Sequence, residues 1–285
     1  MDEVSALLSQ KIPLGLWIKH LTDFLTDNFA SVFDAISIGL GTAIEWLIDV
    51  FLWPPPLVFI AIIAVLAYVL HRRWQLVVLV LVGLLLIYNL GYWTETMQTL
   101  ALVISATILS LAIGIPIGIL CAHRPLVYAV IRPILDLMQT LPTFVYLIPT
   151  LILFGLGVAP GLISTVVFAV AAPIRLTYLG IHGVPSPLLE AGEAFGATKR
   201  QLLFKVELPH ALPTIMAGLT QCIMLSLSMV VIAALVGADG LGKPVVRALN
   251  SVNVPMGFEA GLCIVILAVI LDRLVKSERP VGGAH

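Results

Sequence analysis

The chain has 285 residues, of which 60% are hydrophobic and 11% are charged, and its formal net charge at pH 7 is −1. The mean hydropathy of +1.10 excludes a water-soluble domain, in which about a quarter of the residues are charged. We therefore expect an integral membrane protein. Its apolar segments lack the period-two alternation of barrel strands, so we predict an all-α fold.

The N-terminal region, residues 1–56, is predicted to lie at the outer surface of the membrane. It contains seven acidic and two basic side chains, which give it a net charge of −5. Apolar residues between positions 16 and 33 recur at helical spacing beside charged ones, which is typical of an interfacial amphipathic helix. A second such segment, residues 36–51, stops before a run of three prolines. We expect both segments to brace the spans, with recognition of lipid or of a partner as the alternative.

Residues 57–275 are predicted to form a transmembrane domain of about seven helical spans. Most of the segments approach the length of about 20 apolar residues that a helix needs to cross a bilayer. The predicted spans are residues 57–70, 74–93, 97–122, 138–156, 161–181, 214–236 and 257–275.

The distribution of Lys and Arg predicts the orientation of the chain. If seven spans alternate in direction, eleven of the fifteen basic residues fall on one face of the membrane and four on the other. Loops rich in Lys and Arg stay in the cytoplasm. We therefore expect the C-terminal tail, residues 276–285, and the polar loop of residues 183–213 in the cytoplasm, and the N-terminus outside.

The loop of residues 183–213 is the only long polar stretch in the apolar second half of the chain. Ser186, followed by proline, predicts the start of a helix, and Gly196 predicts its end. Thr198, with Gln201 three residues later, forms a capping box that starts a second helix. This loop is longer and more ordered than a connector between two spans needs to be.

Two prolines shape the end of the same loop. Pro209 and Pro213 are expected to stop the second helix and to restart the chain in the next span. We predict two short helices that lie parallel to the membrane and meet at an elbow around Gly196. Small side chains leave this elbow open to close approach by another protein, and an ordinary loop on the membrane surface is the alternative.

Part of the loop resembles a known motif. Glu190-Ala191-Gly192, three residues, Gly196, nine residues and Val206-Glu207-Leu208-Pro209 resemble the EAA loop of binding-protein-dependent ABC importer permeases. The pattern of that family is E-A-A, three residues, G, nine residues, I-x-L-P, so Gly192 and Val206 depart from it without changing the spacing. The resemblance implies that the loop docks onto a separate ATPase subunit. The implied contact residues are Glu190, Ala191, Gly192, Phe195, Gly196, Ala197, Leu208 and Pro209.

Other segments are similar to the proline/glycine betaine/choline branch of these permeases: residues 136–144, 226–231, 237–244 and the acidic N-terminal region. The resemblance implies a translocation subunit of the bacterial inner membrane that imports a small quaternary ammonium compound, such as choline or glycine betaine. It implies a homodimer, two ATPase subunits that carry ATP and Mg²⁺, and an extracytoplasmic substrate-binding protein. It implies no cofactor, no catalysis and no nucleic acid for this chain itself.

Two further patterns do not predict a nucleotide or metal site. Residues 237–243 match the phosphate-binding spacing G-x-x-x-x-G-K, but Pro244 replaces the Ser or Thr that would meet Mg²⁺, and a span precedes the segment instead of a strand. We expect a flexible loop at the outer mouth. The histidines at the cytoplasmic ends of spans, which we interpret as interfacial anchors and not as metal ligands, are His71, His123, His182 and His210.

Polar residues inside apolar segments are costly and mark candidate pathway positions. They are Gln139, Thr140, Thr143, Tyr146, Ser226 and Ser228. The ring of Tyr146 also suits a quaternary ammonium group. In the alternative interpretation the hydroxyl groups bond their own helix backbone, and Asp136 stays at the cytoplasmic interface with Arg132 four residues earlier.

An ATP-independent secondary transporter or channel is the alternative of another class. It predicts a carboxylate at the centre of a span and an inverted internal repeat, and the sequence shows neither. Within the importer class, a permease for another small polar substrate such as methionine is the nearest alternative. The N-terminal amphipathic region disfavours it.

Overall fold

The computed structural model describes residues 14–276, and every regular element in this part of the chain is helical, as predicted. The helices are α2 (Leu14–Leu52), α3 (Pro56–His71), α4 (Trp74–Asn89), α5 (Trp93–His123), α6 (Pro125–Thr140), α7 (Thr143–Phe154), α8 (Val158–Ala169), α9 (Ala171–His182), α10 (Ser186–Ala194), α11 (Lys199–Leu202), α12 (Leu208–Ala233), α13 (Gly242–Ser251) and α14 (Val254–Val275). A π-helical turn (Leu203–Glu207) precedes α12 and a 3₁₀ turn (Ala234–Val236) follows it. Residues 1–13 of the N-terminal region, and the predicted tail beyond Lys276, lie outside the described residues.

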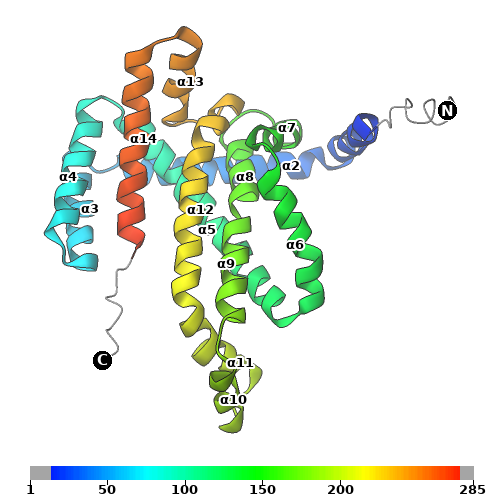
Figure 1. The fold of residues 1–285 in the computed structure, drawn as a ribbon. Coiled ribbons are helices and arrows are strands. Elements are labelled where there is room, and N and C mark those ends of the chain that lie inside the picture. Colours follow the sequence, from blue (N-terminus) through cyan, green and yellow to red (C-terminus); the bar gives the residue numbers. More distant parts are fainter. Residues whose placement is uncertain (1–13, 277–285) are drawn as a thin grey trace, which may run out of the picture.

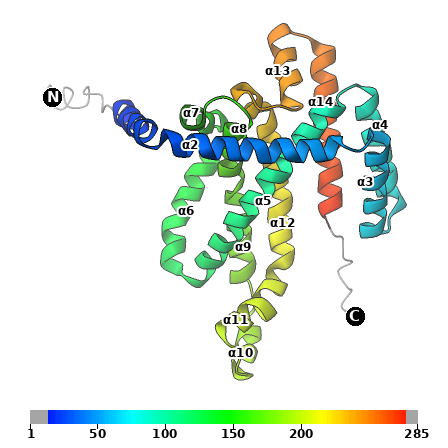
Figure 2. The same ribbon diagram turned by 180° about the vertical axis from the view of Figure 1, so that it is seen from behind.

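The helix α2 is continuous and replaces the two segments predicted for the N-terminal region, because no proline separates them. It crosses the upright helices near one end, at the level of α7 and α8 (Figure 2). Ile44 is buried beside Ala101 and Leu162, while Trp46 and most other large apolar side chains of α2 are exposed. By length and composition α2 also qualifies as a span, so its place at the membrane surface stays a prediction.

Within residues 14–276, five helical segments are long and apolar enough to cross a membrane, or six if one bent pair counts as a span. They are Gly15–Leu52, Trp93–His123, Val158–His182, Lys199–Val236 and Val254–Val275. The number differs from the predicted seven. The first two predicted spans became α3 and α4, which have 16 residues each. A helix of that length is about 24 Å long, whereas the hydrocarbon core measures about 30 Å.

The predicted span of residues 138–156 is not one straight helix, because the chain bends by 100° between α6 and α7. Pro142 disfavours helical geometry at the residue before it, and Leu141 accordingly has an extended conformation with φ −66° and ψ 135°. α6 thus ends before Pro142. It begins at Pro125, immediately after α5, and lies beside α9 (Figure 1). This shift moves Arg132 and Asp136 from a predicted loop onto the length of a helix.

Small residues let α5, α9 and α12 approach closely. In a bilayer the hydrophobic effect does not drive helices together, so close van der Waals packing at small residues contributes more to their association. A Cβ atom added to Gly118 of α5 would lie 2.6 Å from the Cβ of Thr177 in α9. A Cβ atom added to Gly180 of α9 would lie 3.0 Å from the Cβ of Ala211 in α12. The three helices therefore form a tightly packed unit, and the polar loop projects from one end of it (Figure 1).

Candidate functional site

The polar loop folds into a compact projection built around the predicted elbow. α10 begins at Ser186 and ends at Ala194. Gly196 has a φ of +76°, in the left-handed region that favours glycine. The N–H of Ala197 donates to the carbonyl of Gly192 over 3.1 Å and closes the helix end. The chain therefore reverses direction at Gly196.

The second helix of the loop starts with the predicted capping box. The backbone N–H of Thr198 donates to Gln201 Oε1 over 2.8 Å, and the backbone N–H of Gln201 donates to Thr198 Oγ1 over 3.3 Å. These two bonds satisfy N–H groups that a helix start would otherwise leave unpaired. This prediction is confirmed.

The prediction that Pro209 and Pro213 stop this second helix is wrong. Lys199–Val236 is one helical rod, in which α11 continues through the π-helical turn into α12. The N–H of Leu208 donates to the carbonyl of Leu203, five residues earlier. This wider turn relieves the clash of a proline ring with the carbonyl four residues before it. The second helix is thus in line with α12, and the elbow is attached to a rigid rod.

Most of the predicted contact residues lie on the outer side of the elbow. Phe195 is 93% exposed, which is unusual for a large aromatic side chain on a polar loop. Aromatic residues of this kind often carry the binding energy of protein interfaces. Leu208 differs, because it packs inward beside Ile181 and Ile215. The other exposed contact residues are Glu190, Ala191, Gly196 and Pro209.

Gly192 and Ala197 are half-buried on the inner side of the elbow. A Cβ atom added to Gly192 would lie 2.7 Å from Cδ1 of Leu202 in the second helix. Glycine in place of the third alanine of the motif therefore lets the two helices of the loop touch. The departure is visible in the sequence, but the packing that explains it is not.

A contact between a buried carboxylate and an exposed histidine lies at the base of the loop, and no sequence pattern predicted it. Glu207 is 6% exposed, and its Oε2 lies 2.8 Å from Nε2 of His123 at the end of α5. The two residues are 84 positions apart in the chain, so no local pattern brings them together. The contact ties the π-helical turn to α5, and with it the elbow to the spans.

The six candidate pathway residues do not form one surface. Gln139, Thr140 and Thr143 lie at the bend between α6 and α7, where the first two are exposed. The hydroxyl of Tyr146 is buried at the same bend and donates to the carbonyl of Met138. On α12, Ser226 is buried, whereas Ser228 is exposed and donates to its own helix at the Met224 carbonyl over 3.0 Å.

Charged side chains also lie along two helices above the loop, and the place of Asp136 relative to the membrane interface stays a prediction. Asp136 of α6 forms an ion pair with Arg175 of α9. Arg132 lies one turn before Asp136 on the same helix and is exposed. These charges belong to two neighbouring helices and not to the loops between spans.

The glycine-rich segment after α12 is packed and not flexible, which corrects the prediction of a flexible loop. The N–H of Leu241 donates to Thr99 Oγ1 over 2.9 Å. A Cβ atom added to Gly240, which has a φ of +120°, would lie 2.5 Å from the same oxygen. Lys243, the counterpart of a phosphate-binding lysine, is paired with Asp239. The segment is therefore a close-packed turn against α5.

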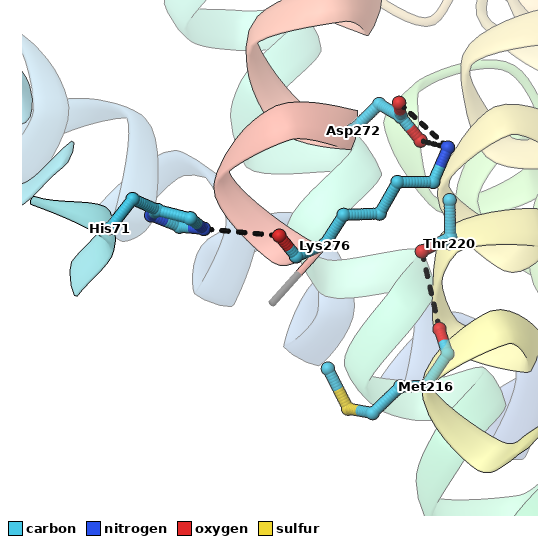
Figure 3. Close-up of polar contacts among 5 residues, drawn as sticks. All are labelled: His71, Met216, Thr220, Asp272 and Lys276. Carbon is cyan, nitrogen blue, oxygen red and sulfur yellow. Dashed lines mark hydrogen bonds and ion pairs between the residues drawn. The ribbon is translucent and has the colours of Figure 1, made fainter. Parts of the chain in front are cut away.

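The histidines make individual contacts at the ends of helices. Nε2 of His71 donates to the carbonyl of Lys276 over 3.2 Å, and Nζ of Lys276 donates to Asp272 over 2.9 Å, which joins the end of α3 to the end of α14 (Figure 3). His182 stacks on Tyr178, and His210 is exposed. Within residues 14–276, no group of three His, Cys, Asp or Glu side chains could hold a metal ion.

Comparisons with known proteins place this geometry in a family. Residues 114–277 match the family described as binding-protein-dependent transport system inner membrane component. The chain is 46% identical over 267 residues to the glycine betaine transport system permease protein OpuAB of Bacillus subtilis, with 94% of each chain covered. It is 44% identical over 271 residues to the glycine betaine/carnitine transport permease protein GbuB of Listeria monocytogenes, with 93% of this chain and 95% of that protein covered.

Among solved structures, the chain is similar to an inward facing conformation of the MetNI methionine ABC transporter. The TM-score is 0.56 at 26% identity, and the match covers 63% of this chain and 94% of that one. The part of this chain that matches the family model includes the whole loop and the helices on both sides of it. This chain is therefore a multi-pass membrane protein that belongs to the family of binding-protein-dependent transport system inner membrane components.

Proposed function

We propose that this chain is the permease subunit of an ATP-driven importer for small quaternary ammonium compounds. The observation that carries the proposal is the identity of 44–46%, over nearly the full length, to permeases named for glycine betaine and carnitine transport. Both solutes combine a quaternary ammonium group with a carboxylate. Choline shares the cationic group, and it belongs to the same substrate class.

The partners follow from the same relationship. Two copies of the chain form the pathway, and two ATPase subunits bind ATP and Mg²⁺ at the cytoplasmic face. A substrate-binding protein delivers the solute from the other side. The N-terminus lies outside and the C-terminus in the cytoplasm. The chain itself catalyses no reaction, and the exposed elbow with Phe195 at its tip supports a docking role towards the ATPase.

The coupling path runs from the elbow into the rod. Closure of the ATPase subunits on ATP moves α10, and because α11 continues without a break into α12 the movement reaches the spans. The His123–Glu207 pair conveys the same movement to α5. The pathway then opens outward, and it opens inward after hydrolysis.

Reconstitution of the chain with its ATPase and its binding protein in proteoliposomes tests the proposal. We expect ATP-dependent accumulation of glycine betaine, and none without ATP or without the ATPase. Accumulation by the chain alone would establish a secondary transporter or channel instead. Accumulation of methionine but not of glycine betaine would assign the chain to a different substrate class.

Co-purification with the ATPase tests the docking surface. The double variant Glu190→Lys with Gly196→Trp adds a reversed charge and a large side chain to the elbow, and we expect it to lose the ATPase. The control, Asn250→Lys with Ser251→Trp, places the same two new side chains at exposed positions of α13, away from the elbow. Equal recovery of the ATPase with both double variants would refute the docking role.

A further inference from the structure

Three charged side chains lie within the length of two neighbouring helices, α6 and α9, and not at the helix ends. Arg132 and Asp136 follow the start of α6 by seven and eleven residues, and Arg175 precedes the end of α9 by seven. At 1.5 Å per residue these offsets are about 10, 16 and 10 Å from the helix ends next to the polar loop. A hydrocarbon core of about 30 Å that begins at these helix ends would contain all three. Charges at such depth are costly and generally face a cavity or a transport path.

The three charges line one recess between α6 and α9. Its volume is about 210 Å³, and its wall includes Tyr128, Arg132, Asp136, Arg175, Tyr178 and Leu179. Sites for drug-sized ligands measure roughly 300–1,000 Å³. The recess is smaller than this range and suits a small solute.

The charges of the recess are not balanced. Asp136 and Arg175 form an ion pair and neutralise each other. The guanidinium of Arg132 has no ion pair or hydrogen bond with any residue of the described part, 14–276. The recess therefore presents one uncompensated cation, which favours a ligand that brings a carboxylate.

Aromatic rings lie on the same wall. Tyr128, Arg132 and Asp136 follow one another at four-residue spacing, so they share one face of α6. The ring of Tyr128 stacks on that of Tyr178, with a centroid distance of 3.7 Å and an interplanar angle of 9°. A tyrosine ring carries the negative quadrupole that attracts quaternary ammonium groups, and both rings border the recess. Along one helix the chain thus places an aromatic ring one turn from a guanidinium.

We propose that this recess is a transit site for a zwitterionic quaternary ammonium solute. Arg132 donates hydrogen bonds to the carboxylate, and the methylated ammonium group rests against Tyr128. Asp136 and Arg175 hold the two helices in register beside it. The inference rests on the proposed function, and it adds that the permease itself, and not only its binding protein, favours zwitterions over cations such as choline.

The test measures the amount of glycine betaine transported per ATP hydrolysed in proteoliposomes. The binding protein is loaded with glycine betaine and added at saturation, so that its affinity no longer limits the rate. For Arg132→Gln we expect this ratio to fall about tenfold, the effect of losing one charge-assisted hydrogen bond. ATP hydrolysis stimulated by the binding protein should stay near the wild-type rate. Arg132→Lys should keep most transport, and Arg124→Gln, at the start of the same helix and outside the recess, should behave like the wild type.

Two results for Arg132→Gln would overturn the transit site. An unchanged ratio would mean that the solute does not use the guanidinium, and an equal loss of transport and of ATP hydrolysis would mean a structural role. In either case transport by the wild type would leave the proposed function standing, whereas a wild type that transports neither glycine betaine nor choline would refute that function.

A second variant keeps the test open if Arg132→Gln does not assemble. Leu179→Cys adds a thiol to the wall of the recess, whereas the native cysteines are buried. Glycine betaine added during ATP turnover should slow the reaction of this thiol with a maleimide, and glycerol should not. Equal labelling rates with both solutes would overturn the proposal.

Discussion

Replacing glycines by alanine tests whether close helix packing holds the spans together. Gly118, Gly192 and Gly261 are all helical, so alanine favours the helix by about 1 kcal/mol at each. They differ in what the new methyl group meets. At Gly118 it would lie 2.6 Å from the Cβ of Thr177 and 2.8 Å from the carbonyl oxygen of Ile174. These atoms are rigid parts of α9, so the two helices must separate.

The expected magnitudes follow from these contacts. Overpacking in a tight interior costs about 1–3 kcal/mol, so Gly118→Ala should lower the free energy of unfolding by about 1 kcal/mol after the gain in helix propensity. At Gly192 the methyl group meets the flexible end of Leu202, and a shifted rotamer costs about 1 kcal/mol. The net change there should be close to zero. Nothing lies within 4 Å at Gly261, so alanine should stabilise the protein.

Thermal unfolding in detergent, followed with a thiol-reactive dye, provides the assay. Cys121, Cys222 and Cys263 are buried and become reactive as the helices separate. We expect the unfolding temperatures to rise in the order Gly118→Ala, Gly192→Ala, Gly261→Ala. If Gly118→Ala unfolds at the same temperature as Gly261→Ala, close contact between α5 and α9 does not limit stability, and the reasoning is wrong.

Three further predictions concern the loop and the turn after α12. Phe195→Ala should weaken ATPase binding by at least about 2 kcal/mol if its ring is an interface anchor. Pull-down titrations measure this binding, and the control is Phe258→Ala, which removes an exposed ring near the start of α14. His123→Ala leaves the Glu207 carboxylate buried without its partner and should lower the free energy of unfolding by about 1–3 kcal/mol. Adding Glu207→Gln to the His123→Ala variant should recover part of this loss. Additive effects of the two substitutions in the double-mutant cycle would show that the pair does not interact. Gly240→Ala places a side chain at a φ of +120° in a closed space and should lower the unfolding temperature more than Gly261→Ala changes it, whereas equal temperatures would mean that the turn is loose.

Local chemistry accounts for the features of the loop that were predicted correctly. The capping box needs only Thr198 and Gln201 at the right spacing, and the elbow needs only a glycine that tolerates a positive φ. Both features depend on a few neighbouring residues, and both are present. The motif around Glu190 is similarly local, because its spacing is a property of about twenty consecutive residues, and it therefore indicates the family from sequence alone.

The prolines show where local rules end. Pro142 breaks the chain between α6 and α7, but Pro209 and Pro213 lie within one continuous rod. The rule that proline ends a helix assumes regular helical geometry before it. The π-helical turn at Leu203–Glu207 changes that geometry before Pro209, whereas Pro213 lies inside the α-helix α12. Neither residue periodicity nor capping patterns predict the wider spacing of the π-helical turn.

The sequence by itself determined the class of this protein, its all-helical fold and the family to which its loop belongs. Apolar composition admits few structures in a membrane, and short motifs act through neighbouring residues. Only the tertiary structure decided which polar groups meet. Asp136 and Arg175 are 39 positions apart, and His123 and Glu207 are 84 apart. Such pairs depend on how α5, α6, α9 and the loop pack, and no periodicity along the chain specifies that packing.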